Sequence, residues 1–215
     1  MIDLHMHSTF SDGELIPSEV VSRALYAGYT HLAITDHADP SNLEFLLERI
    51  AHVCRELEGK VGAKVYPGVE ITHVPPPLIA PLVALARKKG AKVVTVHGET
   101  IVEPVPKGTN RAAIEAGADI LAHPGLISEA EVVLAAKKGV LLEITARRGH
   151  SLANGHVARL ATICGARLVY NTDSHSPGDF TPWEDALRII RGAGLSDGDA
   201  ARMQENARAL VERKR

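Results

Sequence analysis

The sequence predicts a closed α/β barrel made of seven β-α units. Short runs rich in Val, Ile and Leu alternate with longer segments in which apolar residues recur at helical spacing, a pattern typical of parallel strands joined by crossover helices. An open doubly wound sheet would show the same alternation. The closed barrel is favoured because His, Asp or Glu follows six of the seven predicted strands, and only closure brings so many strand ends to one opening.

Each predicted strand is a short apolar segment that follows a helix stop or a turn. The first begins at residue 2, and Gly90, Gly117, Gly139 and Gly165 each end a helix shortly before the next strand. The seven strands are predicted at residues 2–5, 31–35, 63–69, 92–96, 119–122, 140–144 and 167–171.

The helices are predicted from apolar residues at helical spacing that lie between recognisable start and stop residues. Pro17 is tolerated in a first helical turn. Ser128 with Glu131, and Thr181 with Glu184, have the spacing of a capping box. The helices are predicted at about 17–27, 42–58, 78–89, 110–116, 128–139 and 155–164, from 181 onward, and at 196–211.

The composition is that of an ordinary globular protein, with 215 residues of which 45% are hydrophobic and 23% charged. This length suits a single domain over residues 1–215 and is short for two. The net charge of −2 does not favour nucleic-acid or membrane binding, and the longest apolar stretch, 75–86, is too short to span a bilayer. Cys54 and Cys164 form no C-x-x-C pair, so we expect reduced thiols and a cytoplasmic protein. Nothing in the sequence predicts the oligomeric state.

Nine residues that can bind metal ions lie at or just after the ends of the predicted strands. His5 and His7 are two residues apart, so on an extended chain their imidazoles point to the same side. Any one of the nine alone is more often a hydrogen-bonded core residue or a helix cap, but scattered core residues would not keep to one end of the strands. The nine are His5, His7, Asp12, His37, Glu70, His97, His123, Asp173 and His175.

This ligand set predicts a centre of two or three divalent ions. Imidazole with carboxylate and without thiolate suits Zn, Mn or Fe. Three such ions carry more positive charge than three carboxylates can neutralise, so the site is positive. A positive site favours a phosphate ester over a neutral amide as the substrate. Arg147 and Arg148, which follow the sixth predicted strand, could fork onto phosphate oxygens, unless they are solvated surface charges.

The order of these motifs resembles the PHP (polymerase and histidinol phosphatase) family over essentially the whole chain. The motifs are H-x-H with Ser11-Asp12-Gly13, Thr35-Asp36-His37, Gly68-Val69-Glu70, an isolated His97, His123-Pro124-Gly125 and Asp173-Ser174-His175. The resemblance implies a distorted seven-stranded TIM-like barrel with two or three metals at the carboxyl ends of the strands. Members of the family include histidinol-phosphate phosphatases, nucleotide phosphoesterases and exonuclease domains of bacterial DNA polymerases.

The resemblance also implies which residues share an ion. It places His5, His7, Glu70 and Asp173 on one metal. Glu70 would bridge to a second metal, held also by His97 and His123, and Asp12, His37 and His175 would hold a third. Members of the family have histidine or aspartate at position 12, and the aspartate here supplies an oxygen, which favours Mn, Fe or Mg at the third site.

We therefore predict a metal-dependent phosphoesterase that releases phosphate from a small phosphorylated substrate, resembling a histidinol-phosphate phosphatase or a nucleotide phosphatase. A hydroxide between two metals would attack phosphorus, the arginines would clamp the phosphate, and Asp173 or a metal-bound water would protonate the leaving alcohol. The alternatives are a phosphodiesterase or exonuclease with the same metals, a metal-dependent amidohydrolase, and a non-catalytic metal-binding accessory module.

Other polar residues near the predicted strand ends are candidates for smaller roles. Glu99 and Glu143 are expected to orient ligand imidazoles or to lie on the surface, and Asp36 either caps a helix or orients His37. Four residues are candidates for substrate contacts at the mouth of the barrel: His73, Lys107, His150 and His156.

Overall fold

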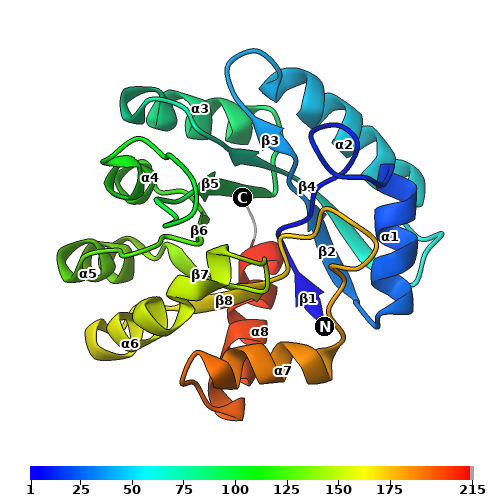
Figure 1. Cartoon of the computed structure of the whole chain (residues 1–215). Helices are drawn as coiled ribbons and strands as arrows, with labels where there is room; N and C mark the ends of the chain where they lie inside the picture. The colour runs from blue at the N-terminus through cyan, green and yellow to red at the C-terminus, as the bar shows by residue number, and fades with distance from the viewer. Residues whose placement is uncertain (214–215) are drawn as a thin grey trace.

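The structure is a computed structural model that describes residues 1–213. Helices lie around the outside of a ring of strands, and the two kinds of element alternate along most of the chain (Figure 1). The strands are β1 (Ile2–Asp3), β2 (His31–Ile34), β3 (His37–Ala38), β4 (Lys64–Ile71), β5 (Val93–His97), β6 (Ile120–Ala122), β7 (Leu141–Thr145) and β8 (Leu168–Asn171). The helices are α1 (Pro17–Tyr26), α2 (Leu43–Leu57), α3 (Pro76–Lys88), α4 (Thr109–Ala116), α5 (Glu129–Lys138), α6 (Asn154–Cys164), α7 (Trp183–Gly192) and α8 (Asp197–Glu212), with a short 3₁₀ turn, η1 (His150–Ala153), before α6.

The strands form a parallel sheet that curves into a nearly closed barrel. Its order is β1-β2-β4-β5-β6-β7-β8, with β3 also beside β4. The seam lies between β8 and β1, where Met6 and Ser174 form an isolated parallel bridge and the His7 N–H donates to the Ser174 carbonyl oxygen at 2.9 Å. The predicted seven-stranded barrel is confirmed, and its first and last strands meet at this seam.

The strand predicted at 31–35 ends one residue early, and the chain re-enters the sheet as β3. β2 pairs His31 with Lys64 and β3 pairs His37 with Glu70, so one register along β4 continues across the break. In the break, the side chain of Asp36 accepts hydrogen bonds from the N–H and the hydroxyl of Ser8, both at 2.7 Å. The interruption therefore ties the loop after β1 to the sheet and returns His37 to a position beside Glu70.

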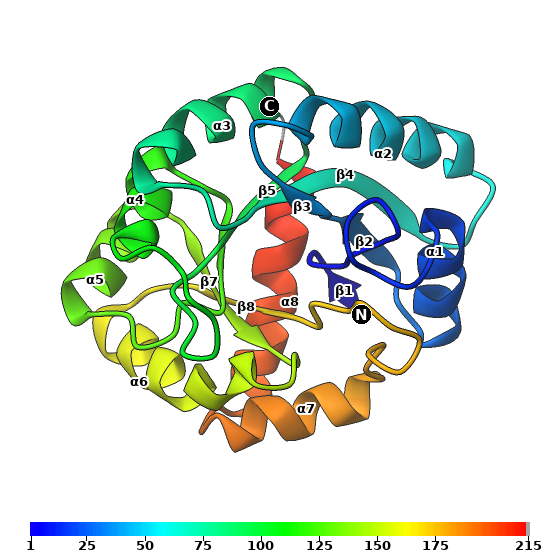
Figure 2. The same cartoon turned by 45° about the horizontal axis from the view of Figure 1, so that its top comes forward.

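The amino-terminal end of the barrel is filled with apolar side chains and closed by α8, which crosses that end of the strands (Figure 2). Inward residues such as Ile2, Val93 and Val169 form one cluster with Ala207 and Leu210 of α8. This end is therefore a packed core, as in other closed barrels, and the carboxyl ends of the strands are left for polar chemistry.

The helix starts agree with the sequence in part. Ser128 and Glu131 form the predicted capping box at α5. The capping box predicted at Thr181 is wrong, because Pro182 occupies the N-cap position of α7 and the Thr181 hydroxyl donates to the Asp179 carbonyl instead. α3 begins at 76 and not at 78, since prolines fit the first helical positions, where the missing N–H is not needed. None of the helices in residues 1–213 is long and apolar enough to cross a membrane.

Candidate metal centre

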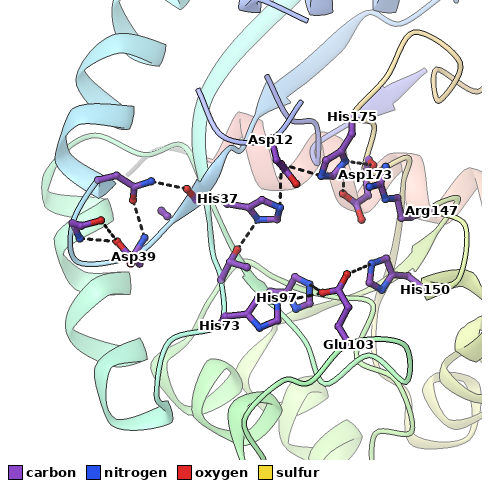
Figure 3. A pocket seen from close by; sticks show the side chains of 14 residues that line it. Asp12, His37, Asp39, His73, His97, Glu103, Arg147, His150, Asp173 and His175 are labelled. Carbon is purple, nitrogen blue, oxygen red and sulfur yellow. Dashed lines mark hydrogen bonds and ion pairs between the residues drawn. The ribbon is translucent and has the colours of Figure 1, made fainter. Parts of the chain in front are cut away.

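The nine residues predicted as metal ligands gather at the carboxyl end of the barrel. His5 and His7 follow β1 directly, His37 and Glu70 lie in the paired strands β3 and β4, and His97 ends β5. Part of the set lines a pocket of about 420 Å³, a volume typical of small-ligand sites (Figure 3). Of the nine predicted ligands, those lining the pocket are Asp12, His37, His97, Asp173 and His175.

Four buried side chains form what we call the floor of the centre: His5, His7, Glu70 and Asp173. His5 Nε2 lies 3.3 Å from Glu70 Oε1, and His7 Nε2 lies 3.2 Å from Asp173 Oδ1. His5 Nε2 is also 3.7 Å from Asp173 Oδ1. Nitrogen and oxygen ligands of a tetrahedral zinc ion, bound at about 2.0–2.1 Å, lie about 3.3 Å from one another. The floor therefore has the spacing of a four-ligand ion site.

A second group surrounds Asp12 at the outer side of His7. Asp12 Oδ1 lies 3.4 Å from His37 Nε2 and 3.3 Å from His175 Nε2. The imidazole of His7 stacks on that of His175, with ring centroids 4.1 Å apart. This half-exposed group can hold an ion next to the floor.

A third group lies on the opposite side of the floor, around His97 and His123. His123 Nε2 is 3.7 Å from Glu70 Oε1, so this group adjoins the floor at Glu70. Potential ligand nitrogens of His97, His123 and His150 lie within 4.8 Å of one another. His150 thus joins this group, although its sequence position predicted only a substrate contact.

Several polar atoms of the centre are buried without a hydrogen-bond partner. They include Nε2 of His5, both ring nitrogens of His7, Oε1 of Glu70 and Nδ1 of His123. A buried polar atom without a partner costs about 1–3 kcal/mol, and so many in one place are rare in folded proteins. Metal coordination satisfies such atoms, so the residues present fit divalent ions.

Burial and neighbouring charges shift the pKa values of these groups strongly. Burial opposes a charge on His5, but the carboxylates of Glu143 and Glu70 raise its pKa well above the usual value. Burial also opposes a charge on Glu70, yet His5 and His37 hold its pKa well below the usual range. For His7, burial lowers the pKa, so its imidazole stays neutral. Glu70 is therefore ionised and His7 neutral, the protonation states that metal binding requires, whereas His5 has to release a proton when an ion binds to its Nε2.

The backbone is strained at three residues around the pocket. His73, His123 and Asp173 have φ angles of 54°, 27° and 53°, in a region that residues other than glycine seldom adopt. Such strain persists where surrounding contacts impose it, and it concentrates at functional sites. The strained backbone at His123 and Asp173 directs these two side chains into the centre from the ends of β6 and β8.

Glu143 in β7 supports the floor from below, as predicted. The Nδ1–H of His5 donates to Glu143 Oε1 at 2.8 Å, which leaves Nε2 free to bind an ion. The His123 N–H donates to Glu143 Oε2 at 3.2 Å. Glu99 differs from the prediction, because its carboxylate accepts the N–H groups of Gly108 and Asn110 at the start of α4. Neither predicted role of Asp36 is found, since its carboxylate holds the loop after β1.

The candidate substrate contacts separate into two sets. Arg147, His73 and His150 line the pocket. Arg148 and Lys107 are exposed and lie outside its lining. His156 also lies outside the lining and hydrogen-bonds through Nε2 to the Ile127 carbonyl oxygen at 2.8 Å. Glu103 lines the pocket between His97 and His150 but is not among the sequence candidates, because the loop after β5 carries no motif that marks it.

Comparisons with known proteins agree with this geometry. The PHP domain family model matches residues 3–139. The chain belongs to the PHP domain family. An uncharacterized protein of Methanocaldococcus jannaschii is 44% identical to this PHP protein over 197 residues, which cover 91% of this chain and 90% of that protein. The DNA polymerase/3'-5' exonuclease PolX of Bacillus subtilis is 27% identical over 195 residues, which cover 81% of this chain and 34% of PolX.

Solved structures show the same barrel. A chain in the cryo-EM structure of archaeal Ribonuclease P with mature tRNA matches this PHP chain with a TM-score of 0.74 and 20% identity, covering 99% of this chain and 90% of that one. The crystal structure of a candidate histidinol phosphatase, hisK of Listeria monocytogenes, matches with a TM-score of 0.62 and 12% identity, covering 83% and 97%. At these identities the likeness establishes the fold, and the metal centre has to be argued from the residues of this chain.

Proposed function

We propose that this PHP protein is a divalent-metal-dependent phosphoesterase that hydrolyses a small phosphate monoester. The observation that carries the proposal is the convergence of nine imidazole and carboxylate side chains, with unpartnered buried donor atoms, on a pocket large enough for a small ligand. One structural match is described as containing a predicted PHP-like metal-dependent phosphoesterase, which supports a hydrolytic role. The candidate histidinol phosphatase among the structural matches supports a monoester as the first substrate class to test.

The ligands are proposed to hold two or three ions. The floor would hold one, Glu70 with His97 and His123 a second, and Asp12 with His37 and His175 a third. The donor set suits Zn, Mn or Fe, and the oxygen of Asp12 also suits Mg. When bound, such ions lower the pKa of a water nucleophile and neutralise phosphoryl oxygens.

Arg147 is the side chain best placed to bind the phosphate. Its guanidinium lines the pocket, and Nη1 lies 3.5 Å from Asp179 Oδ2. Asp179 is itself fixed, because it accepts hydrogen bonds from the N–H groups of His175 and Ser176. A guanidinium held in this way can form two parallel hydrogen bonds to phosphate oxygens. Arg148 is exposed and outside the pocket, so the proposed clamp consists of Arg147.

The role of Asp173 is proposed to be that of a ligand. Burial raises the pKa of its carboxyl group, and the imidazoles of His5 and His175 oppose that rise. Its two oxygens face different groups, Oδ1 toward His7 and Oδ2 toward His123. A carboxylate that binds cations has to be ionised, so Asp173 cannot also donate a proton. We therefore propose that water in the pocket protonates the leaving alcohol.

A second candidate is a phosphodiesterase or exonuclease activity on nucleotides, which the similarity to PolX favours. The net charge of −2 does not favour a long nucleic-acid strand, which basic grooves usually bind. A dinucleotide without terminal phosphates would separate the two candidates, because it contains a diester and no monoester.

The test combines elemental analysis of the purified protein with a hydrolysis screen that follows phosphate release from monoesters and separates the products of the other substrates by chromatography. The screen contains histidinol phosphate, nucleoside mono- and bisphosphates, a dinucleotide without terminal phosphates and an N-acyl amino acid. Two or three ions per chain with monoester turnover is the expected result. Turnover of the dinucleotide alone would indicate the diesterase, and turnover of the amide alone an amidohydrolase. Ions without any turnover would indicate a metal-binding accessory module, and no ions after reconstitution with Mn or Zn would contradict the proposal.

A further inference from the structure

A carboxylate on the loop after β5 faces three imidazoles at the mouth of the pocket. Glu103 Oε2 lies 3.1 Å from His97 Nε2 and 3.2 Å from His73 Nε2. Glu103 Oε1 lies 3.4 Å from Nε2 of His150, so the carboxylate sits between His97 and His150 (Figure 3). Neither Glu103 nor His150 belongs to the nine motif residues, and the proposed function gives neither a task.

We propose that Glu103 and His150 complete a four-ligand divalent-metal site with His97 and His123. This inference rests on the proposed function, because it extends the same metal centre. It adds two side chains to His97 and His123, which are already proposed as ligands of that ion.

The spacing of the donor atoms supports coordination. The distances from the Glu103 oxygens to His97 Nε2 and His150 Nε2 lie close to the separation of about 3.3 Å expected between ligands of a tetrahedral zinc ion. Potential donor nitrogens of His97, His123 and His150 lie within 4.8 Å of one another. The rings of His123 and His150 stack with centroids 4.1 Å apart. Three imidazoles and one carboxylate on a divalent ion leave one positive charge, which would attract an anionic substrate into the pocket.

The two added side chains are held in place by Thr100 and His73, which are not among the four proposed ligands. His150 is buried, and its Nδ1 hydrogen-bonds to Thr100 Oγ1 at 2.7 Å, so Nε2 remains available as the donor atom. A partner on the second ring nitrogen is the usual support of a metal-binding histidine. His73 holds the Glu103 carboxylate from the exposed side.

The base of the loop that carries Glu103 is fixed to the barrel. The Glu99 side chain accepts the N–H groups of Gly108 and Asn110, which joins the two ends of the loop. Gly125 packs against the Glu99 carbonyl oxygen so closely that an added Cβ would overlap it. The tip is exposed, with Ile101 and Val102 about half accessible. An ion bound by Glu103 would therefore anchor the tip as well and fix one wall of the pocket.

The experiment compares Glu103→Gln and His150→Ala with the wild-type chain after removal of bound metal and reloading with Co²⁺. His156→Ala is the matched control, because His156 lies on the same segment but bonds to the Ile127 carbonyl outside the pocket. The measurements are the ratio of cobalt to protein, the affinity for each ion and the visible absorption of the bound cobalt, with circular dichroism as the test of folding.

We expect both pocket variants to bind one ion at least about tenfold more weakly than the wild type, with a changed cobalt spectrum. The remaining ions and the control should be unaffected. Wild-type cobalt stoichiometry, affinity and spectrum in folded Glu103→Gln would overturn the inference, and a raised KM with that normal cobalt binding would make Glu103 a substrate contact instead. Failure of the wild type to bind any ion would contradict the proposed function itself, so the two failures are distinguishable. Because Glu103 is partly exposed, its variant keeps the test valid if His150→Ala does not fold.

Discussion

The floor of the metal centre and the rim of its pocket are built in different ways. Floor residues such as His5 and Glu70 are buried at strand ends, where the pairing of β1, β2, β3 and β4 sets their separation. Rim residues such as Glu103 and Arg147 lie on loops, with about a third of each side chain exposed, and contacts between side chains hold them. Sheet geometry thus fixes the positions of the proposed metal ligands, and contacts between loop side chains fix the groups around the mouth of the pocket. Variants of the two regions should therefore fail differently.

The largest effects are expected from the floor and its neighbour His123. Asp173→Ala or His123→Ala should lose bound metal and reduce turnover by about 10²–10³-fold or more, because each removes a donor from the centre of the cluster. Metal content and phosphate release measure the loss, and a cooperative thermal transition shows that the fold survives. Normal metal content and activity in both variants would disprove the assignment of the floor.

A smaller loss of metal affinity is expected at Glu143, which supports the floor residue His5. Glu143→Gln keeps the shape of the side chain but removes its negative charge. The Glu143 carboxylate accepts hydrogen bonds from the His5 Nδ1–H and the His123 N–H. Metal affinity should fall by about 10–100-fold, as is typical when the support of a metal-binding histidine is changed. Isothermal titration of the metal-free chain measures it. Unchanged affinity would show that the backbone alone positions His5.

The rim should affect substrate binding and leave the metals in place. Arg147→Ala should raise KM for a phosphomonoester about tenfold, since a charge-assisted hydrogen bond is worth about 1.5–3 kcal/mol. Metal content should stay normal. Arg148→Ala is the matched control, with KM expected within about twofold of the wild type because Arg148 is exposed outside the pocket. Equal effects of the two variants would mean that general positive charge, and not a placed guanidinium, attracts the substrate.

The smallest effect is expected at Lys107, a candidate substrate contact that the structure places outside the pocket lining. Lys107→Ala should leave KM unchanged and alter the free energy of unfolding by no more than about 0.5 kcal/mol, as is usual for an exposed side chain. Steady-state kinetics and denaturant titration measure both quantities. A KM change as large as that of Arg147→Ala would extend the rim to the start of α4.

The sequence was sufficient for the barrel and the floor because both follow from periodic patterns. Apolar strands that end in His, Asp or Glu place those residues at one end of a parallel barrel, as found for His97 and Asp173. Residues that follow neighbouring strands therefore lie next to each other in space once the sheet closes. The break between β2 and β3 did not disturb this result, because the register on both sides of it is the same.

Only part of the rim could be predicted, because loops have no period that converts sequence spacing into distance. Glu103 and Lys107 lie on the same loop, yet only the first lines the pocket. His156 lies six positions after His150, and the chain turns through η1 into α6 between them. His150 hydrogen-bonds to Thr100, and His156 hydrogen-bonds to the Ile127 carbonyl oxygen. The role of Glu99 at the start of α4 likewise depends on how the loop folds back on itself.

The seam between β1 and β8 also determines when the centre can form. Leu4 and Asn171, which are hydrogen-bonded across it, are 167 residues apart in the chain. Contacts between such distant residues form late, because the entropy of closing the intervening chain is lost before the contact stabilises it. During synthesis His5 and His7 emerge before the rest of the barrel, and Asp173 emerges after most of it. Any ion captured by the nascent chain is therefore held by an incomplete ligand set until the last strand closes the barrel.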